Sequence, residues 1–111
     1  KIDREYNHPL LYITENGIAC KDEQIENSIV QDDDRIDYLK KYLEASSRAI
    51  NDGVDLKGYF VWSFLDNFEW LHGYSKRFGL IRVNFKTQER IWKKSAHWYH
   101  DVIQNSGFII N

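Results

Sequence analysis

The first strand-like stretch of the chain is residues 10–14, Leu-Leu-Tyr-Ile-Thr, which shows no clear alternation of apolar and polar positions. An unbroken run of this kind is typical of a strand covered on both faces, as in a parallel sheet. Pro9, the only proline, stands just before it and suits the entry to a strand. The run ends at Glu15, and Asn16 and Gly17 then favour a turn. The pattern therefore predicts a buried strand with an acid at its C-terminal end.

Residues 36–50 carry the spacing of a helix that is apolar on one face. The positions that recur on this face are Ile36, Leu39, Leu43, Ser46, Ser47 and Ile50. Lys40 and Glu44, opposite charges four residues apart, support the helix on its solvent side. Gly53 supplies the expected stop, and the preceding polar segment 20–31 is predicted to be a surface loop.

The second half of the chain opens with another apolar and aromatic run, residues 56–64, which again predicts a buried strand. Residues 66–79 follow as a long irregular segment that is dense in aromatic and charged side chains. Residues 80–85 alternate, and their apolar side carries Ile81, Val83 and Phe85. Residues 86–89 predict a turn. A last helix is expected over 95–104, with an inward face made of Ala96, Tyr99 and Ile103.

The predicted order is strand, helix, strand, hairpin-like excursion and helix, which amounts to two strand–helix units of a parallel α/β architecture. Two parallel strands that need cover on both faces cannot bury themselves, since a stable sheet of this kind requires more strands and more helices. We therefore expect the chain to be one piece of a larger α/β domain.

Composition narrows the range of partners. The chain has 111 residues, enough for one compact unit, and its net charge of −2 gives no reason to expect nucleic acid or an anionic membrane as a partner. The sequence shows no signal peptide and no apolar run long enough to suggest a membrane span. The single cysteine, Cys20, cannot form an internal disulfide and favours a reducing compartment, so a cytoplasmic location is expected.

Chemistry is expected where the strands end, because ligands of parallel α/β folds bind at the C-terminal ends of the strands. Both Glu15 and the segment after the second strand fall there. If the strands are neighbours, one cavity would gather Glu15, Asp66, Glu69, Trp62, Trp70 and Phe78. Two carboxylates with aromatic walls favour sugar chemistry, in which one acid is the nucleophile and the other the general acid/base. Spacing alone pairs Glu15 with Glu69. The alternative is a plain turn after Glu15 beside an aromatic core.

Two groups of residues raise the question of a metal. Asp32, Asp33 and Asp34 are consecutive acids, but a helical pattern begins at once, and acids are favoured at a helix N-terminus. His97 and His100 lie three apart on the last helix, with no third ligand evident. The helix start is the preferred interpretation of the acids, and two histidines without a third ligand do not favour a metal site, so neither a metal nor a cofactor is expected.

Five motifs, in this order, resemble the C-terminal part of family 1 glycoside hydrolases, the β-glucosidases, 6-phospho-β-glucosidases and their relatives. They are ITENG, DDxRIxYLxxYL, GYFVWSFLDNFEW, GYSKRFGL and SAxWY, and they cover nearly the whole chain. The fold of that family is a (β/α)₈ TIM barrel. The resemblance implies that residues 1–111 are its C-terminal quarter, strands seven and eight with their helices, completed by another chain.

The resemblance implies a role for each matching residue. Glu15 in ITENG would be the catalytic nucleophile, and Trp62 would form the floor of the site for the terminal sugar. Glu69 and Trp70 would hydrogen-bond the outer hydroxyls of the sugar, and Phe78 would help to line the site. These roles replace the pairing of Glu15 with Glu69. The acid/base of the family lies in a Thr-x-Asn-Glu-Pro motif that this sequence lacks.

The implied function is a retaining β-glycosidase acting on terminal β-D-glucosides or galactosides. Its expected partners are the β-glucoside substrate and the N-terminal complementary portion of the barrel, as a separate chain. Leu71 and His72 after the NFEW motif argue against a phosphorylated sugar, and Trp92 departs from the proline of many members. Two alternatives stay open, a non-catalytic carbohydrate-binding module and a structural complement of a split barrel.

Overall fold

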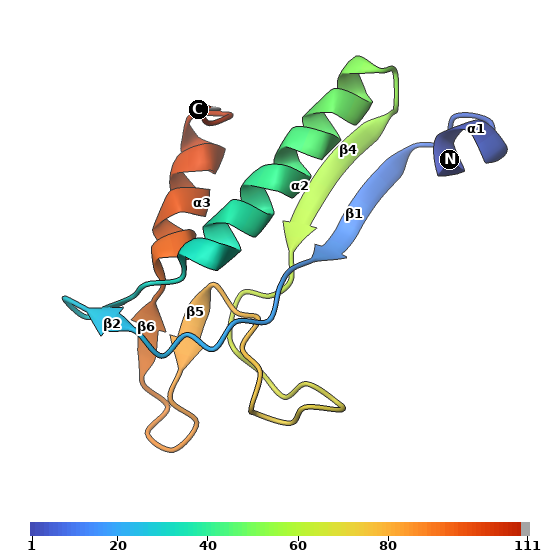
Figure 1. The fold of residues 1–111 in the computed structure, drawn as a ribbon. Helices are drawn as coiled ribbons and strands as arrows, with labels where there is room; N and C mark the ends of the chain where they lie inside the picture. The colour runs from blue at the N-terminus through green and yellow to red at the C-terminus, as the bar shows by residue number, and fades with distance from the viewer. Residues whose placement is uncertain (110–111) are drawn as a thin grey trace.

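A computed structural model describes residues 1–109. Two helices pack with a two-stranded parallel sheet, and short strands and long loops follow the C-terminal ends of its strands (Figure 1). In chain order the elements are α1 (Ile2–Glu5), β1 (Leu11–Asn16), β2 (Ile25–Glu26), β3 (Ile29–Val30), α2 (Asp33–Asn51), β4 (Leu56–Val61), β5 (Ile81–Val83), β6 (Arg90–Trp92) and α3 (Lys94–Gln104).

β1 and β4 pair in parallel, which confirms the predicted arrangement of the two long strands. Their lengths differ from the prediction at the C-terminal ends. β1 continues through Glu15 to Asn16, and β4 ends at Val61, before the aromatic residues Trp62 and Phe64. Glu15 therefore belongs to the strand itself and is fixed by the sheet, while Trp62 stands one residue beyond it.

α2 begins directly after Asp32, as the run of acids predicts. Both helices contribute to a small core of Leu39, Leu80, Ile81 and Ala96, with Tyr38, Val61, Leu65, Trp98 and Tyr99 packed around it. The predicted inward faces are wrong at their far ends, since Ile50 is 50% and Ile103 60% exposed. Each lies in the last turns of its helix.

Four short elements were not predicted from the sequence, namely α1, β2, β3 and β6. The polar segment 20–31 contains the β2–β3 hairpin, and the polar N-terminus contains α1. The alternating segment forms β5, and after the predicted turn the chain returns antiparallel as β6. These strands have two or three residues each, too short for a periodic pattern to reveal.

The face of the sheet opposite the helices is open. Tyr12 of β1 and Phe60 of β4 are both more than half exposed on it. The Tyr59 hydroxyl lies on the helix side, since it donates to Asn16, whose amide also bonds to Tyr38 of α2. The helices of residues 1–109 cover only one side of the sheet, which agrees with the expectation that these two strands cannot bury themselves. No helix within the described residues has the length and hydrophobicity to cross a membrane.

Candidate functional site

Glu15 owes its direction to an irregularity in β1. Ile13 pairs with Tyr59 and Asn16 with Val61, so β1 advances by three residues where β4 advances by two. The extra residue is a β-bulge, a feature that changes which face a side chain occupies. Two consecutive residues of β1, Thr14 and Glu15, are exposed. Because Asn16 bonds to Tyr38 of α2, alternation along the strand puts its neighbour Glu15 on the opposite, open face. The bulge turns the next residue, Asn16, back toward the helices.

Asn16 anchors this strand end on the helix side. Its Oδ1 accepts a hydrogen bond of 2.6 Å from the Tyr59 hydroxyl, and its Nδ2 donates to the Tyr38 hydroxyl at 3.3 Å. Burial raises the pKa of Tyr59 far above its ordinary value, so this hydroxyl remains a proton donor throughout the neutral range. The Asn16 amide thus ties β1 to both β4 and α2, next to Glu15. Sequence reasoning treated Asn16 only as a turn residue and missed this role.

Trp62 lies directly beside that strand end. Its backbone N–H donates to the Asn16 carbonyl at 2.9 Å, and the Trp62–Ser63 peptide bond is cis. Gly17 is essential to this contact, because a Cβ on it would lie 1.8 Å from the Trp62 carbonyl oxygen. The indole N–H of Trp62 donates to Oε1 of Glu69 at 3.2 Å. The structure therefore joins three of the predicted residues, Glu15 through its strand end and Trp62 and Glu69 directly.

Glu69 stands at the base of a tight turn in the long loop between β4 and β5. Its backbone exchanges hydrogen bonds with Gly73 at 2.8 and 2.6 Å. Trp70 and Leu71 at the tip of the turn are 90% and 95% exposed. Glu69 is accordingly fixed in the backbone, and the indole of Trp70 is fully available to a ligand or to another part of the protein.

Phe78 enters the same region from the other end of this loop. Its carbonyl oxygen accepts a hydrogen bond of 3.0 Å from the N–H of Ser63, the residue that follows Trp62. The loop, coloured yellow in Figure 1, leaves and re-enters the fold on the side where the connection after β1 also runs. The two segments that carry the predicted site residues therefore share one side of the molecule.

Asp66 does not belong to this open site, which corrects the set of six residues proposed from strand ends. It is 4% exposed, and its carboxylate is paired with Lys93 at 2.8 Å and with Arg77 at 2.6 Å. The N–H groups of Gly79 and Val83 donate to it as well. A carboxylate so fully occupied has no free lone pair to offer a substrate, and its role is structural.

Asp32 also serves a purpose that its sequence position did not predict. Its carboxylate accepts from the backbone N–H and the hydroxyl of Ser95, in the first turn of α3. It makes no side-chain cap to its own helix, α2. The acid that precedes one helix thus caps the other, and it also pairs with Arg35. Among the described residues, no group of three or more histidine, cysteine or acidic side chains is arranged to bind a metal.

Cys20 is half-buried between the two loops, and its N–H donates to the Arg77 carbonyl at 3.0 Å. Burial, the largest effect, raises the pKa of its thiol above the ordinary value. At neutral pH the group therefore stays in the thiol form, which is a poor nucleophile.

We predict slow alkylation of Cys20. At pH 7.5 in the folded protein, iodoacetamide should modify it at least about fivefold more slowly than in the urea-unfolded protein, because a raised pKa leaves less thiolate. Mass spectrometry of the peptide that contains Cys20 gives both rates. Equal rates in the two states would show that the fold neither shields the thiol from the reagent nor raises its pKa.

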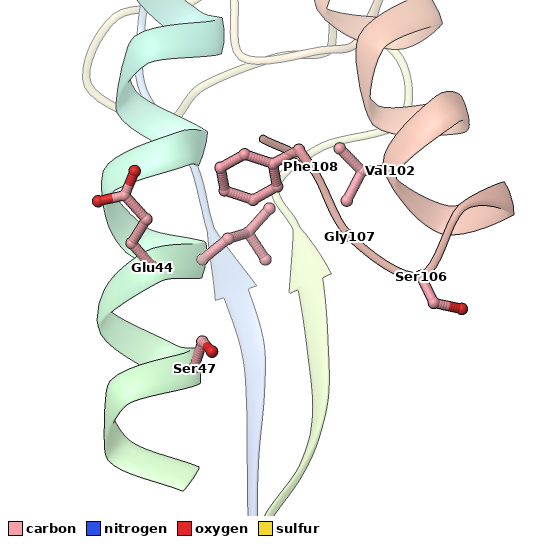
Figure 2. Close-up of a pocket in the computed structure, with 7 residues that line it drawn as sticks. Glu44, Ser47, Val102, Ser106, Gly107 and Phe108 are labelled. Atoms are coloured by element: carbon pink, nitrogen blue, oxygen red, sulfur yellow. The ribbon is translucent and has the colours of Figure 1, made fainter. Parts of the chain in front are cut away.

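The pocket shown in Figure 2 is not at this site. It has a volume of about 290 Å³ and lies between α2 and the C-terminal end of α3. Its lining is mostly apolar, and Glu44 is the one ionisable residue in it. The lining residues are Leu43, Glu44, Ser47, Val102, Ser106, Gly107 and Phe108. None of these residues belongs to β1, to β4 or to the loops that follow them, and the lining offers no pair of groups for acid–base chemistry.

Comparison with known proteins identifies the family of this chain. The sequence profile of Glycosyl hydrolase family 1 matches residues 1–108. Beta-glucosidase A of Acetivibrio thermocellus is 55% identical over 107 residues, which are 96% of this chain and 24% of that protein. Beta-glucosidase A of Thermotoga maritima is also 55% identical over 107 residues, with the same shares.

The structural comparison agrees with the sequence comparison. A solved family 1 β-glucosidase from Thermotoga maritima superposes with a TM-score of 0.94 at 53% identity, covering 98% of this chain and 25% of that one. The chain thus spans about a quarter of the length of the relatives it matches, and it corresponds to a fragment of their TIM barrel. By sequence and by fold, this chain belongs to glycosyl hydrolase family 1.

Proposed function

We propose that this chain is the C-terminal quarter of a retaining β-glycosidase of the β-glucosidase type, contributing strands seven and eight of the barrel. β1 and β4 would be these two strands, and the missing portion of the barrel would complete the site as a separate chain. The observation that carries the proposal is the placement of Glu15, which the bulge in β1 sets on the open face beside Trp62. The substrate would be a terminal β-D-glucoside or galactoside.

The open face of the sheet supports a partner that covers it. Large apolar side chains are exposed there and just beyond, among them Tyr12, Phe60 and Phe64. In a closed barrel this face turns toward the interior, where side chains from the other strands fill the space. Covering it would return the two strands to the fully buried state that their sequence predicts.

In the proposed reaction Glu15 attacks the anomeric carbon and forms a glycosyl ester, and water then releases the sugar with retained configuration. Trp62 supports the sugar ring by stacking, and Glu69 and Trp70 bind its outer hydroxyls. The general acid/base would come from the missing portion. Glu69 is unsuited to that role because its carboxylate already accepts the Trp62 indole N–H and its backbone is held in the turn with Gly73.

The test is turnover of 4-nitrophenyl β-D-glucoside by this chain alone and after assembly with the remainder of a family 1 barrel. We expect no enzyme-like turnover from the chain alone, because it lacks a proton donor, and clear turnover from the assembly. A thermal melt of the chain alone should show weak cooperativity, since one face of its sheet is open.

Three results would contradict the proposal. Enzyme-like rates from the isolated chain would mean that its acid/base lies within these residues. Tight glucoside binding by an independently folded chain, with no turnover after assembly, would instead favour a carbohydrate-binding module. Normal assembly with neither sugar binding nor turnover would indicate a structural complement.

A further inference from the structure

A buried cluster of six charged side chains lies between the connection after β1 and the loop after β4. It holds three carboxylates and three cations, so its formal charges balance: Asp22, Asp32, Asp66, Arg35, Arg77 and Lys93. Five of the six are at most 5% exposed. Burying charges is expensive unless each one is paired and hydrogen-bonded, which makes such a cluster sensitive to the loss of any member.

Lys93 connects the two segments that carry the predicted site residues. It is completely buried, and its Nζ lies 2.6 Å from Oδ2 of Asp22 and 2.8 Å from Oδ1 of Asp66. Asp22 belongs to the connection that follows Glu15, and Asp66 to the loop that follows Trp62. One ammonium group therefore joins the two segments across the strand ends.

Arg77 makes a second connection. Its Nη1 donates to Oδ2 of Asp66 at 2.6 Å and to the carbonyl of Val83 at 3.0 Å, and its guanidinium lies over the Phe85 ring. Its own carbonyl accepts from Nη2 of Arg35 at 2.8 Å and from the N–H of Cys20 at 3.0 Å. Both the side chain and the backbone of Arg77 are thus fixed.

Phe78 follows Arg77 and is held from both sides as a result. The cluster fixes Arg77, the residue before Phe78. The N–H of Ser63, the residue that follows Trp62, fixes the Phe78 carbonyl. Gly79, on its other side, approaches the backbone of Leu65 and Asp66 so closely that a Cβ would lie 2.2 Å from the Asp66 nitrogen. The Phe78 segment has little freedom to move while the cluster is intact.

We propose that Arg77 and Lys93 are positioning residues for the sugar site, which fix the Phe78 segment relative to Trp62 and to the strand end that carries Glu15. The inference rests on the proposed glycosidase function. Neither side chain touches the substrate. Both act through the backbone that they immobilise, and site groups must be held to within a fraction of an ångström for efficient catalysis.

The test compares variants of the assembled barrel that contains this chain. Arg77→Met should raise KM for 4-nitrophenyl β-D-glucoside and Ki for glucose by about tenfold, since a mobile Phe78 segment weakens sugar binding. Arg77→Lys keeps the pair with Asp66 and should restore both constants to within about threefold. Lys94→Met, which breaks the neighbouring exposed pair with Asp33, is the matched control and should change neither constant.

Amide hydrogen exchange supplies a readout that needs no sugar. The N–H groups of Ser63 and Leu80, which bond to the carbonyls of Phe78 and Ser63, should exchange at least tenfold faster in Arg77→Met and normally in Arg77→Lys. If Arg77→Met does not fold, Arg77→Gln takes its place with the same expectation, because glutamine is polar enough for the site but lacks the charge and the length needed to pair with Asp66.

Unchanged KM, Ki and exchange rates in a folded Arg77→Met variant, with only a lower melting temperature, would overturn the inference. A merely structural role reduces the amount of folded enzyme and leaves KM of the folded fraction unaltered. Failure of the proposed function looks different, because the unmodified assembly would then show no turnover, while the exchange rates would still decide whether the cluster fixes the Phe78 segment.

Discussion

Replacing Glu15 with glutamine is expected to lower kcat of the assembled barrel on 4-nitrophenyl β-D-glucoside by at least about 10⁴-fold, the scale on which loss of a catalytic nucleophile acts. The amide has nearly the same shape, but its oxygen is too weak a nucleophile to form a glycosyl ester. Because the variant preserves size and β1 is otherwise unchanged, binding of glucose should change by less than about tenfold.

Glu23→Gln is the matched control for this variant. Glu23 is an exposed acid on the connection after β1, away from the strand end, and its loss should leave kcat unchanged. Circular dichroism would verify that both variants are folded. Residual turnover of Glu15→Gln within tenfold of the unmodified enzyme would remove Glu15 from the role of nucleophile. So would a 2-deoxy-2-fluoroglucoside that labels a different residue.

Gly17→Ala is expected to have the second largest effect. The new Cβ would lie 1.8 Å from the carbonyl oxygen and 2.9 Å from the carbonyl carbon of Trp62, and these are backbone atoms that no rotamer change can move. The ends of β1 and β4 must then separate, which stretches the hydrogen bond from the Trp62 N–H to the Asn16 carbonyl. We expect a loss of about 2–4 kcal/mol in the free energy of unfolding and a fall of about 100-fold in kcat/KM.

Gly53→Ala separates the two consequences. Gly53 has a φ of +95°, and a Cβ added to it would meet no atom within 4 Å. Alanine therefore strains the backbone without a clash, and it does so far from the C-terminal strand ends that carry Glu15 and Trp62. It should cost about 1 kcal/mol of stability and leave kcat/KM unchanged. Urea unfolding and steady-state kinetics give both quantities. A Gly17→Ala enzyme with normal kcat/KM would show that this contact does not position the site.

The parts of the fold that the sequence predicted are those that rest on long, regular patterns. β1, β4 and both long helices follow from apolar runs and from a helical face, and the parallel pairing follows from their order. The expectation that chemistry gathers at the strand ends came from the general behaviour of parallel α/β folds. It led to Glu15, Trp62 and Glu69, whose backbones or side chains the structure brings together.

The parts that escaped prediction depend on contacts between distant residues. Asp22 and Lys93 form an ion pair across 71 positions, and neither neighbourhood contains a pattern that connects them. Asp66 looked like a site acid because it follows a strand, yet its environment is set by Lys93 and Arg77 from other elements. The bulge in β1 is equally hidden, since it arises from pairing with β4 and not from the letters of either strand.

That bulge has a consequence for anyone who transplants this site. A designer who copied Thr14, Glu15 and Asn16 onto a regular strand of another barrel would restore strict alternation, and the carboxylate would then turn outward beneath the surrounding helices. The Asn16 amide would face the barrel interior in its place. A working graft must therefore carry the added residue of β1 together with the strand that pairs with it, β4, because the geometry depends on both strands.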